Sequence, residues 1–422
     1  MKRLFPIILT GILNFSVCPA FSAPIEIAFD NLKPLLDSRS SRLKAAEIER
    51  EASRERTGSL GRSFLPKIEL HAAQESFKSS VESWQAEPSF GAEINLNLFN
   101  GGRDGLENQI RELHVERKVV QVQQVVADEL QTLRKLYWET VYTLDKIDQI
   151  EAAIKVNVAN MAAAVKRIRS GVATESDRVE FEMNAVDLDR ELAESRLKLA
   201  NQSREFAILL NFSLSEKLTF PRRLEHNHDF EAALKHEAQD HDFLYKDDEL
   251  KSQEGELAAE KQRRSWWPEV DAFAAYNDYS HRIESAGPDT SNDATNEAVI
   301  GIRMKMGLGA IFDGTREAAA LAKEASADKK RADLKRRQAE AHMENELAEL
   351  RLLHEQIHSA EENILRAERY YKLTQSEYGR GVKNSPDVLG ASEKLYENRL
   401  KRLEIIKDFQ IAKSHVLAKI GK

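Results

Sequence analysis

Two stretches of the chain alternate apolar and polar residues with a period of two. They cover residues 90–98 and 298–308, with apolar residues at Phe90, Ala92, Ile94, Leu96 and Leu98, then at Ala298, Ile300, Ile302, Met304, Met306 and Leu308. Alternation over about ten residues is typical of a β-strand with one apolar and one polar face, and suits a membrane-barrel strand. Segments after Pro66 and Pro268 predict a partner strand for each. We therefore expect strand pairs at about 64–99 and 267–310, although an ordinary half-buried hairpin would also fit the strands alone.

Each strand pair is followed by a long segment with helical periodicity. Neither glycine nor proline interrupts residues 106–170 or 315–378. Heptad positions recur at Val126, Leu133, Thr140, Ile147, Ile154, Met161 and Ile168, and in the second segment at Met343, Leu350, Ile357, Ile364, Tyr371 and Tyr378. At a rise of 1.5 Å per residue, such helices approach ~100 Å. Gly171 and Gly381 end them, and returning helices are expected near 175–210 and 386–419. Their apolar stripes require coiled-coil partners, within the chain or from other chains.

The second half of the chain repeats the order of the first. Ser63-Phe-Leu-Pro66 is echoed by Trp266-Trp-Pro268, and Gly171-Val-Ala-Thr-Glu-Ser-Asp177 by Gly381-Val-Lys-Asn-Ser-Pro-Asp387. Several such marks in one order indicate an internal duplication. The predicted organisation is a signal peptide at 1–22, a first repeat at 23–210 that opens with a helix, an equatorial or linker region at 211–257, and a second repeat at 258–422.

Composition narrows the class of protein. Of 422 residues, 31% are charged and only 7% are aromatic, with 10 prolines and 18 glycines. Heavy charge with few helix breakers favours long solvated helices over a compact enzyme. The formal net charge of −8 gives no electrostatic support for a nucleic-acid partner.

The first residues are typical of a secretory signal. Met1-Lys2-Arg3 is basic, residues 4–17 are mostly apolar, and cleavage is expected after Ala20 or Ser22. No later segment has the ~20 apolar residues of a spanning helix. The mature chain is therefore expected to be exported, and to span a membrane only with strands. Cys18, the only cysteine, either leaves with the signal or carries a lipid anchor.

The number of strands per chain predicts the number of chains in the assembly. Four strands cannot close a barrel, and an open sheet edge is not tolerated in lipid. Two chains would give eight strands, whose interior is filled by side chains, whereas three chains give twelve strands and room for a pore. A cyclic homotrimer is the smallest assembly that is both closed and hollow.

This order of elements resembles the TolC-type outer-membrane efflux family. The resemblance rests on the strand exit Leu98-Phe-Asn-Gly-Gly-Arg103, the repeated Gly-x5-Asp tips and the closing helix, and covers about residues 25–420. It implies a mainly α fold with a small β part, in which a trimeric 12-stranded β-barrel continues into a periplasmic α-helical barrel. It also implies a passive outer-membrane conduit of a Gram-negative bacterium, which serves an efflux pump or type I secretion system. The expected partners are outer-membrane lipid, a periplasmic adaptor and an inner-membrane pump.

Candidate site residues gather at the turns. Gly101, Gly102 and Gly314 mark the expected strand-to-helix turns, where glycine permits the backbone and free N–H groups could attract an anion. The hairpin tips, which are also candidates for adaptor contact, comprise Gly171, Ser176, Asp177, Gly381, Ser385 and Pro386. Pro386 suits the first turn of the returning helix.

Two acidic residues at the tips carry the sharpest hypothesis. Asp177 and Asp387 fall in the first turns of the returning helices, where a carboxylate caps the helix and is favoured by its dipole. The family resemblance adds a second role for Asp387, because an acidic residue there lines the closed periplasmic entrance. Three copies would form a cation-favouring constriction. Family members often carry another acidic residue where this chain has Gly390, so this motif supplies one ring at most.

The remaining motif gives a weaker alternative. His354-Glu-Gln-Ile-His358 matches the zinc-protease pattern, but a catalytic zinc needs a third ligand and an open position in a cleft. We therefore expect the protein to have no enzymatic activity and to bind neither a cofactor nor a metal ion. The competing hypotheses are a periplasmic coiled-coil protein without a pore, which would not need two-faced strands, and a zinc hydrolase.

Overall fold

The computed structural model describes residues 25–77, 85–221, 224, 243–278 and 296–419. The expected signal peptide with Cys18 and the strand loops around Val81 and Ala286 lie outside these residues. The helical elements are η1 (Phe29–Asn31), α1 (Leu32–Arg39), α2 (Ser41–Glu55), α3 (Ser59–Ser63), α4 (Arg103–Arg169), α5 (Glu175–Leu209), α7 (Phe243–Arg263), α8 (Ala310–Gly379) and α9 (Ser385–Lys419). The strands are β1 (Ile25–Glu26), β2 (Lys67–Phe77), β3 (Gln85–Asn100), β4 (Leu218–Thr219), β5 (Glu269–Asp278) and β6 (Asn296–Lys305).

Contacts divide the chain into two compact units that cut across the sequence repeats. The first unit contains Leu136–Leu224 and Ala367–Leu403 together with the N-terminal residues up to Leu35. The second contains Leu36–Lys135, Glu225–Arg366 and Glu404–Lys422. Each repeat therefore contributes its strands to the second unit and its hairpin tip to the first. The division 23–210, 211–257 and 258–422 remains a prediction about sequence duplication.

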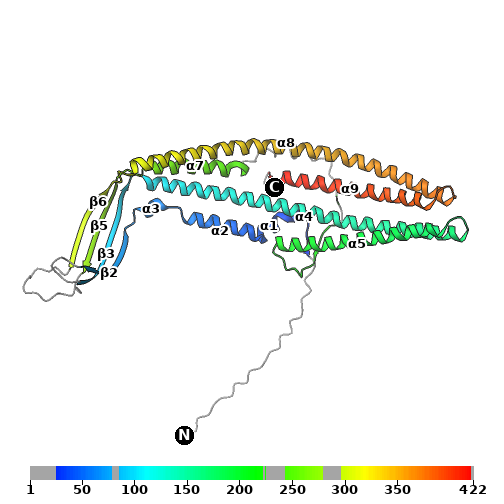
Figure 1. Cartoon of the computed structure of the whole chain (residues 1–422), viewed down its shortest axis with the longest axis horizontal. Coiled ribbons are helices and arrows are strands. Elements are labelled where there is room, and N and C mark those ends of the chain that lie inside the picture. Colours follow the sequence, from blue (N-terminus) through cyan, green and yellow to red (C-terminus); the bar gives the residue numbers. More distant parts are fainter. Residues whose placement is uncertain (1–24, 78–84, 222–223, 225–242, 279–295, 420–422) are drawn as a thin grey trace, which may run out of the picture. The chain divides into compact units, whose positions relative to one another are not determined.

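In the second unit, the four long strands form one antiparallel sheet in the order β2-β3-β5-β6 (Figure 1). The two predicted strand pairs are thus joined side by side through β3 and β5. β2 and β5 begin directly after Pro66 and Pro268, as expected, because proline cannot donate to the ladder. β6 ends at Lys305, so the predicted strand to residue 308 is too long. Met306 to Gly309 instead lead into α8.

The register gives the sheet one apolar and one polar face. Residues paired directly across strands share a face. One such row is Leu70, Ala92, Tyr276 and Ala298, and the next is Ile68, Ile94, Ala274 and Ile300. On this face the side chains of Leu70 and Ile300 are 82% and 88% exposed. The opposite face carries charged and polar residues, including Glu69, Glu93, Asp271, Asn277 and Arg303.

A glycine makes room on the polar face. The His71 Nε2 and Asn277 Oδ1 atoms lie 2.9 Å apart across β3. A Cβ on Gly91 would lie only 2.4 Å from that histidine nitrogen and 2.3 Å from the asparagine oxygen. The absence of a side chain at Gly91 therefore allows this bond to cross the strand between its partners.

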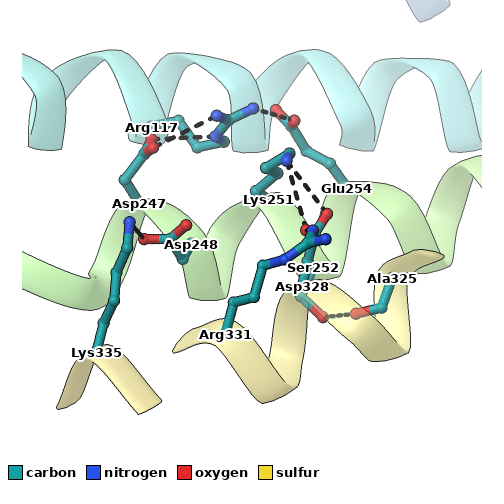
Figure 2. A network of polar contacts seen from close by, with 10 residues as sticks. All are labelled: Arg117, Asp247, Asp248, Lys251, Ser252, Glu254, Ala325, Asp328, Arg331 and Lys335. Carbon is teal, nitrogen blue, oxygen red and sulfur yellow. Dashed lines mark hydrogen bonds and ion pairs between the residues drawn. The ribbon is translucent and has the colours of Figure 1, made fainter. Parts of the chain in front are cut away.

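The helices of the second unit pack through small residues and charges. Ala318, Ala325 and Ala332 are buried at heptad spacing on α8, and a Cβ on Gly255 of α7 would lie 2.9 Å from the Ala325 Cβ. The Ser252 hydroxyl donates to the Ala325 carbonyl at 2.8 Å. Figure 2 shows the ion pairs that join α7 to both neighbours: Arg117 with Asp247 and Glu254, Lys251 with Asp328, and Lys335 with Asp248. No helix in the described residues is long and apolar enough to cross a membrane.

The first unit holds an aromatic cluster beside its two-stranded sheet. β1 pairs in parallel with β4. The Tyr137 ring lies 5.7 Å from that of Phe29 and 6.5 Å from that of Phe220, which in turn lies 4.9 Å from Phe206. Phe206 and Tyr137 are almost fully buried. These contacts connect the segment around Phe29 to α4, α5 and the segment after α5.

Candidate functional site

Both hairpin tips are built by a glycine turn followed by a reciprocal cap. Gly171 and Gly381 have φ angles of +75° and +82°, which L-residues with side chains rarely adopt. In the first tip, Thr174 caps α5 and its backbone N–H donates to the Asp177 carboxylate at 2.8 Å. In the second, the Asn384 backbone N–H donates to Asp387 at 3.2 Å and the Asp387 N–H donates to the Asn384 side chain at 3.3 Å.

The Asp177 carboxylate also reaches the second tip. It accepts hydrogen bonds from both the hydroxyl and the backbone N–H of Ser385, the first residue of α9. A carboxylate from one hairpin therefore satisfies an unpaired N–H at the helix start of the other. Burial alone raises the pKa of Asp177, but the bonds from Thr174 and Ser385 outweigh it and hold this pKa below its usual 3.8.

Arg167 makes a second connection between the tips. Its guanidinium donates to the Lys383 carbonyl at 3.2 Å and lies 4.0 Å from the centre of the Tyr378 ring. The Tyr378 hydroxyl lies 3.1 Å from the Ser385 hydroxyl, and both residues are buried. We call this set the tip junction: Arg167, Asp177, Tyr378, Lys383 and Ser385. It packs on a small core of Ala164, Phe181 and Val388.

The sequence-predicted tip residues thus divide into two groups. Asp177 and Ser385 belong to the tip junction. Asp387 caps its own helix and lies 3.6 Å from the Lys383 ammonium. Ser176 and Pro386 are the second residues of α5 and α9, where the returning helices begin. Thr174 and Asn384 precede these helices and share the caps with Asp177 and Asp387.

Sequence reasoning missed Arg167 and Tyr378. A signal for them was present in the comparison of the two copies. In that alignment, Arg167 stands opposite Glu377 and Ser385 opposite Glu175, so the tips differ in charge where they meet.

The strand-to-helix turns differ between the copies. Gly101 and Gly102 have φ angles of +58° and +70° and form the turn between β3 and α4, as predicted. The prediction for Gly314 is wrong, because this residue lies inside α8, and Gly307 to Gly309 precede the helix. A Cβ on Gly314 would lie 2.4 Å from the Ser265 hydroxyl, so a larger residue there would require the Ser265 side chain to move.

The histidine motif forms no metal centre within the described residues. The His354 and His358 rings lie 5.0 Å apart on α8, and His354 also lies 6.2 Å from Phe409 of α9. No group of three His, Cys, Asp or Glu side chains in the part of the chain that the structure describes is placed to hold a metal ion.

Comparison with known proteins identifies the family. The sequence profile of the outer membrane efflux proteins matches residues 34–211 and 238–421, which is most of the chain. The chain belongs to the outer membrane efflux protein family. Membership confirms the predicted family, its outer-membrane location and the role of a channel protomer in efflux.

Solved structures of outer membrane proteins and channels share this fold. The outer membrane protein VceC of Vibrio cholerae superposes with a TM-score of 0.77 at 14% identity, over 93% of this chain and 96% of its own. The CmeC outer membrane channel of Campylobacter jejuni gives 0.74 at 14% identity, over 100% and 94%. The MtrE channel of Neisseria gonorrhoeae in its open state gives 0.71 at 14% identity, over 93% and 88%. Among curated proteins, none matches the chain.

Proposed function

We propose that three copies of this chain close a twelve-stranded barrel and conduct substrates passively across the outer membrane. The observation that carries this proposal is the four-stranded sheet with one exposed apolar face and one polar face. A periplasmic coiled-coil protein without a pore has no use for such a sheet. In a closed barrel the apolar face contacts lipid and the polar face lines the lumen.

Copies are needed because the sheet has open edges. Within the described residues, β2 and β6 each pair with one strand only. The free backbone groups of such edges are costly in lipid, and pairing β6 of one copy with β2 of the next satisfies them. Three-fold repetition closes the ring and leaves a pore.

The conduit needs an energy source elsewhere. A periplasmic adaptor that contacts the hairpin tips would link it to an inner-membrane pump or a type I secretion system. Gly171, Ser176 and Asp177 on one hairpin and Gly381, Ser385 and Pro386 on the other are the proposed contact region. Contacts of the tip junction between the two hairpins support this choice, because they hold the two tips together in the folded protomer.

Mass and conductance test the assembly. Light scattering on the mature protein in detergent should give three copies of slightly under 47.9 kDa each. Planar bilayers should show conductance from the same fraction. A fully folded, stable monomer without conductance would refute the proposal.

A ring of three Asp387 side chains is the proposed selectivity element. Asp387→Asn should lower cation selectivity and weaken block by multivalent cations in planar bilayers. Asp177→Asn is the control, because its carboxylate serves the tip junction. Unchanged selectivity in a folded Asp387→Asn trimer would remove this role and leave the conduit intact.

A further inference from the structure

A groove in the first unit lies between the two hairpins, bordered by α4, α5 and α9. Its volume of about 490 Å³ lies within the range of small-ligand sites. Apolar side chains such as Ala153, Val156 and Leu188 line it together with charged ones. The channel role described above assigns no ligand to this groove.

The groove carries an excess of unpaired carboxylates. Its basic side chains are each paired with a carboxylate: Lys146 with Glu191 at 2.8 Å, Arg190 with Asp187 at 3.0 Å, and Arg399 with Glu368 at 2.8 Å. Among the described residues, no basic side chain pairs with Glu194, Glu393 or Glu397, which also line the groove. The Asn184 amide donates to the Glu393 carboxylate at 3.1 Å. Partial burial, together with Glu397 and Asp187, raises the pKa of Glu393.

A buried asparagine supplies an independent sign of a missing partner. Asn157 lines the groove, is 4% exposed, and its side-chain N–H donates to the Phe181 carbonyl at 2.8 Å. A carbonyl oxygen can only accept, so this bond fixes the orientation of the amide. The Asn157 Oδ1 atom is then a buried acceptor without a donor in the described residues. Such an atom is costly to leave unsatisfied, and a donor that reached it from the groove would remove this cost.

We propose that this groove binds a small organic polycation of the polyamine class. The site offers acceptors and negative charge, which an ammonium group satisfies with charge-assisted hydrogen bonds. Within the described residues, no three acidic or histidine side chains converge closely enough to hold a metal ion. The groove is also far larger than an ion requires.

The spacing of the carboxylates suits a linear ligand. Glu393 and Glu397 are four residues apart on α9, which places them about 6 Å apart on one helix face. Asp187 and Glu194 on α5 are seven residues apart, or about 10 Å along the helix axis. A flexible chain with several ammonium groups can reach carboxylates of both helices, whereas one compact cation cannot.

Calorimetric titration of the purified full-length mature protein with spermidine tests the proposal. We expect saturable binding that weakens by about tenfold or more in the Glu393→Gln/Glu397→Gln double variant. The matched control is Glu340→Gln/Glu344→Gln, which removes two exposed carboxylates with the same spacing from α8 and should leave binding unchanged. Circular dichroism and the mass in detergent establish that each variant is folded, so loss of binding is not loss of fold.

Three outcomes would overturn the proposal. The first is the absence of saturable binding, and the second is equal binding in both double variants. The third is complete displacement of spermidine by an equal concentration of MgCl₂, because the site would then recognise divalent charge rather than an organic cation. The test is independent of the pore, because the groove lies within one protomer and a non-conducting protein could still bind spermidine.

Discussion

The two tip aspartates occupy equivalent positions in the repeats but should differ in their energetic roles. Asp177 caps α5 and also accepts two hydrogen bonds from Ser385, whereas Asp387 caps α9 and lies near the half-exposed side chain of Lys383. Loss of a helix cap costs about 1 kcal/mol. The bonds from Ser385 to a partly exposed carboxylate add about 1 kcal/mol. Asp177→Ala should therefore cost about 2 kcal/mol and Asp387→Ala about 1 kcal/mol.

Native-state hydrogen exchange measures these costs locally. At 1.36 kcal/mol per tenfold, Asp177→Ala should speed exchange at the tips by about 30-fold and Asp387→Ala by about 5-fold. Asp177→Ala should also expose the Ser385 amide on the other hairpin, which Asp387→Ala should leave protected. A double-mutant cycle with Ser385→Ala isolates the contact and should give a coupling of about 1 kcal/mol with Asp177. Equal effects of the two aspartates, or zero coupling, would refute the tip junction.

Three other perturbations have defined outcomes. Because the pKa of Asp177 is lowered in the folded protein, the stabilisation of the tip junction should be complete above about pH 3.8 and be lost as the pH falls through the folded-state pKa. Hydrogen-exchange rates at the tips should show this transition in the parent protein and lack it in Asp177→Asn. Gly91→Ala should break the bond between His71 and Asn277 and lower the barrel's thermal midpoint in detergent by an amount equivalent to about 1 kcal/mol; an unchanged midpoint would contradict the close approach. Gly255→Ala should lower the free energy of unfolding in denaturant by about 1–3 kcal/mol. Gly105→Ala, which adds a methyl group to open space, should raise it by about 0.5–1 kcal/mol. A change of the same sign in both variants would argue against the tight helix crossing at Ala325.

The elements were predictable because their signals are local. A period of two places strands after Pro66 and Pro268, and uninterrupted heptads predict α4 and α8. Heptad positions on α8 such as Leu350, Ile357 and Tyr378 are indeed buried. These patterns depend only on the repeat of each element and on one buried face.

The predictions that failed concern residues whose environment is set by neighbours distant in sequence. Val158 lies four residues after the heptad position Ile154, where heptad spacing predicts the second buried position of the seam, but it is 52% exposed. Asn157 and Asn160 are buried instead. The reason is that α5 and α8 supply polar partners, the Phe181 carbonyl and the Tyr371 hydroxyl. The pairing of Asp177 with Ser385 likewise requires two hairpins to meet, and no local spacing encodes that contact.

The open edges of the sheet also constrain how the protein is made. A newly exported protomer exposes the unpaired edges of β2 and β6. These edges flank an apolar face on which Ile300 and Leu70 are largely exposed to solvent. Such edges template aggregation as readily as correct pairing. Assembly of three protomers should therefore compete kinetically with aggregation, and the outcome should depend on the protomer concentration. Escort by holdase chaperones on the way to the bilayer would favour productive encounters, and a shortage of them should deplete this protein before it depletes single-chain barrels that seal themselves.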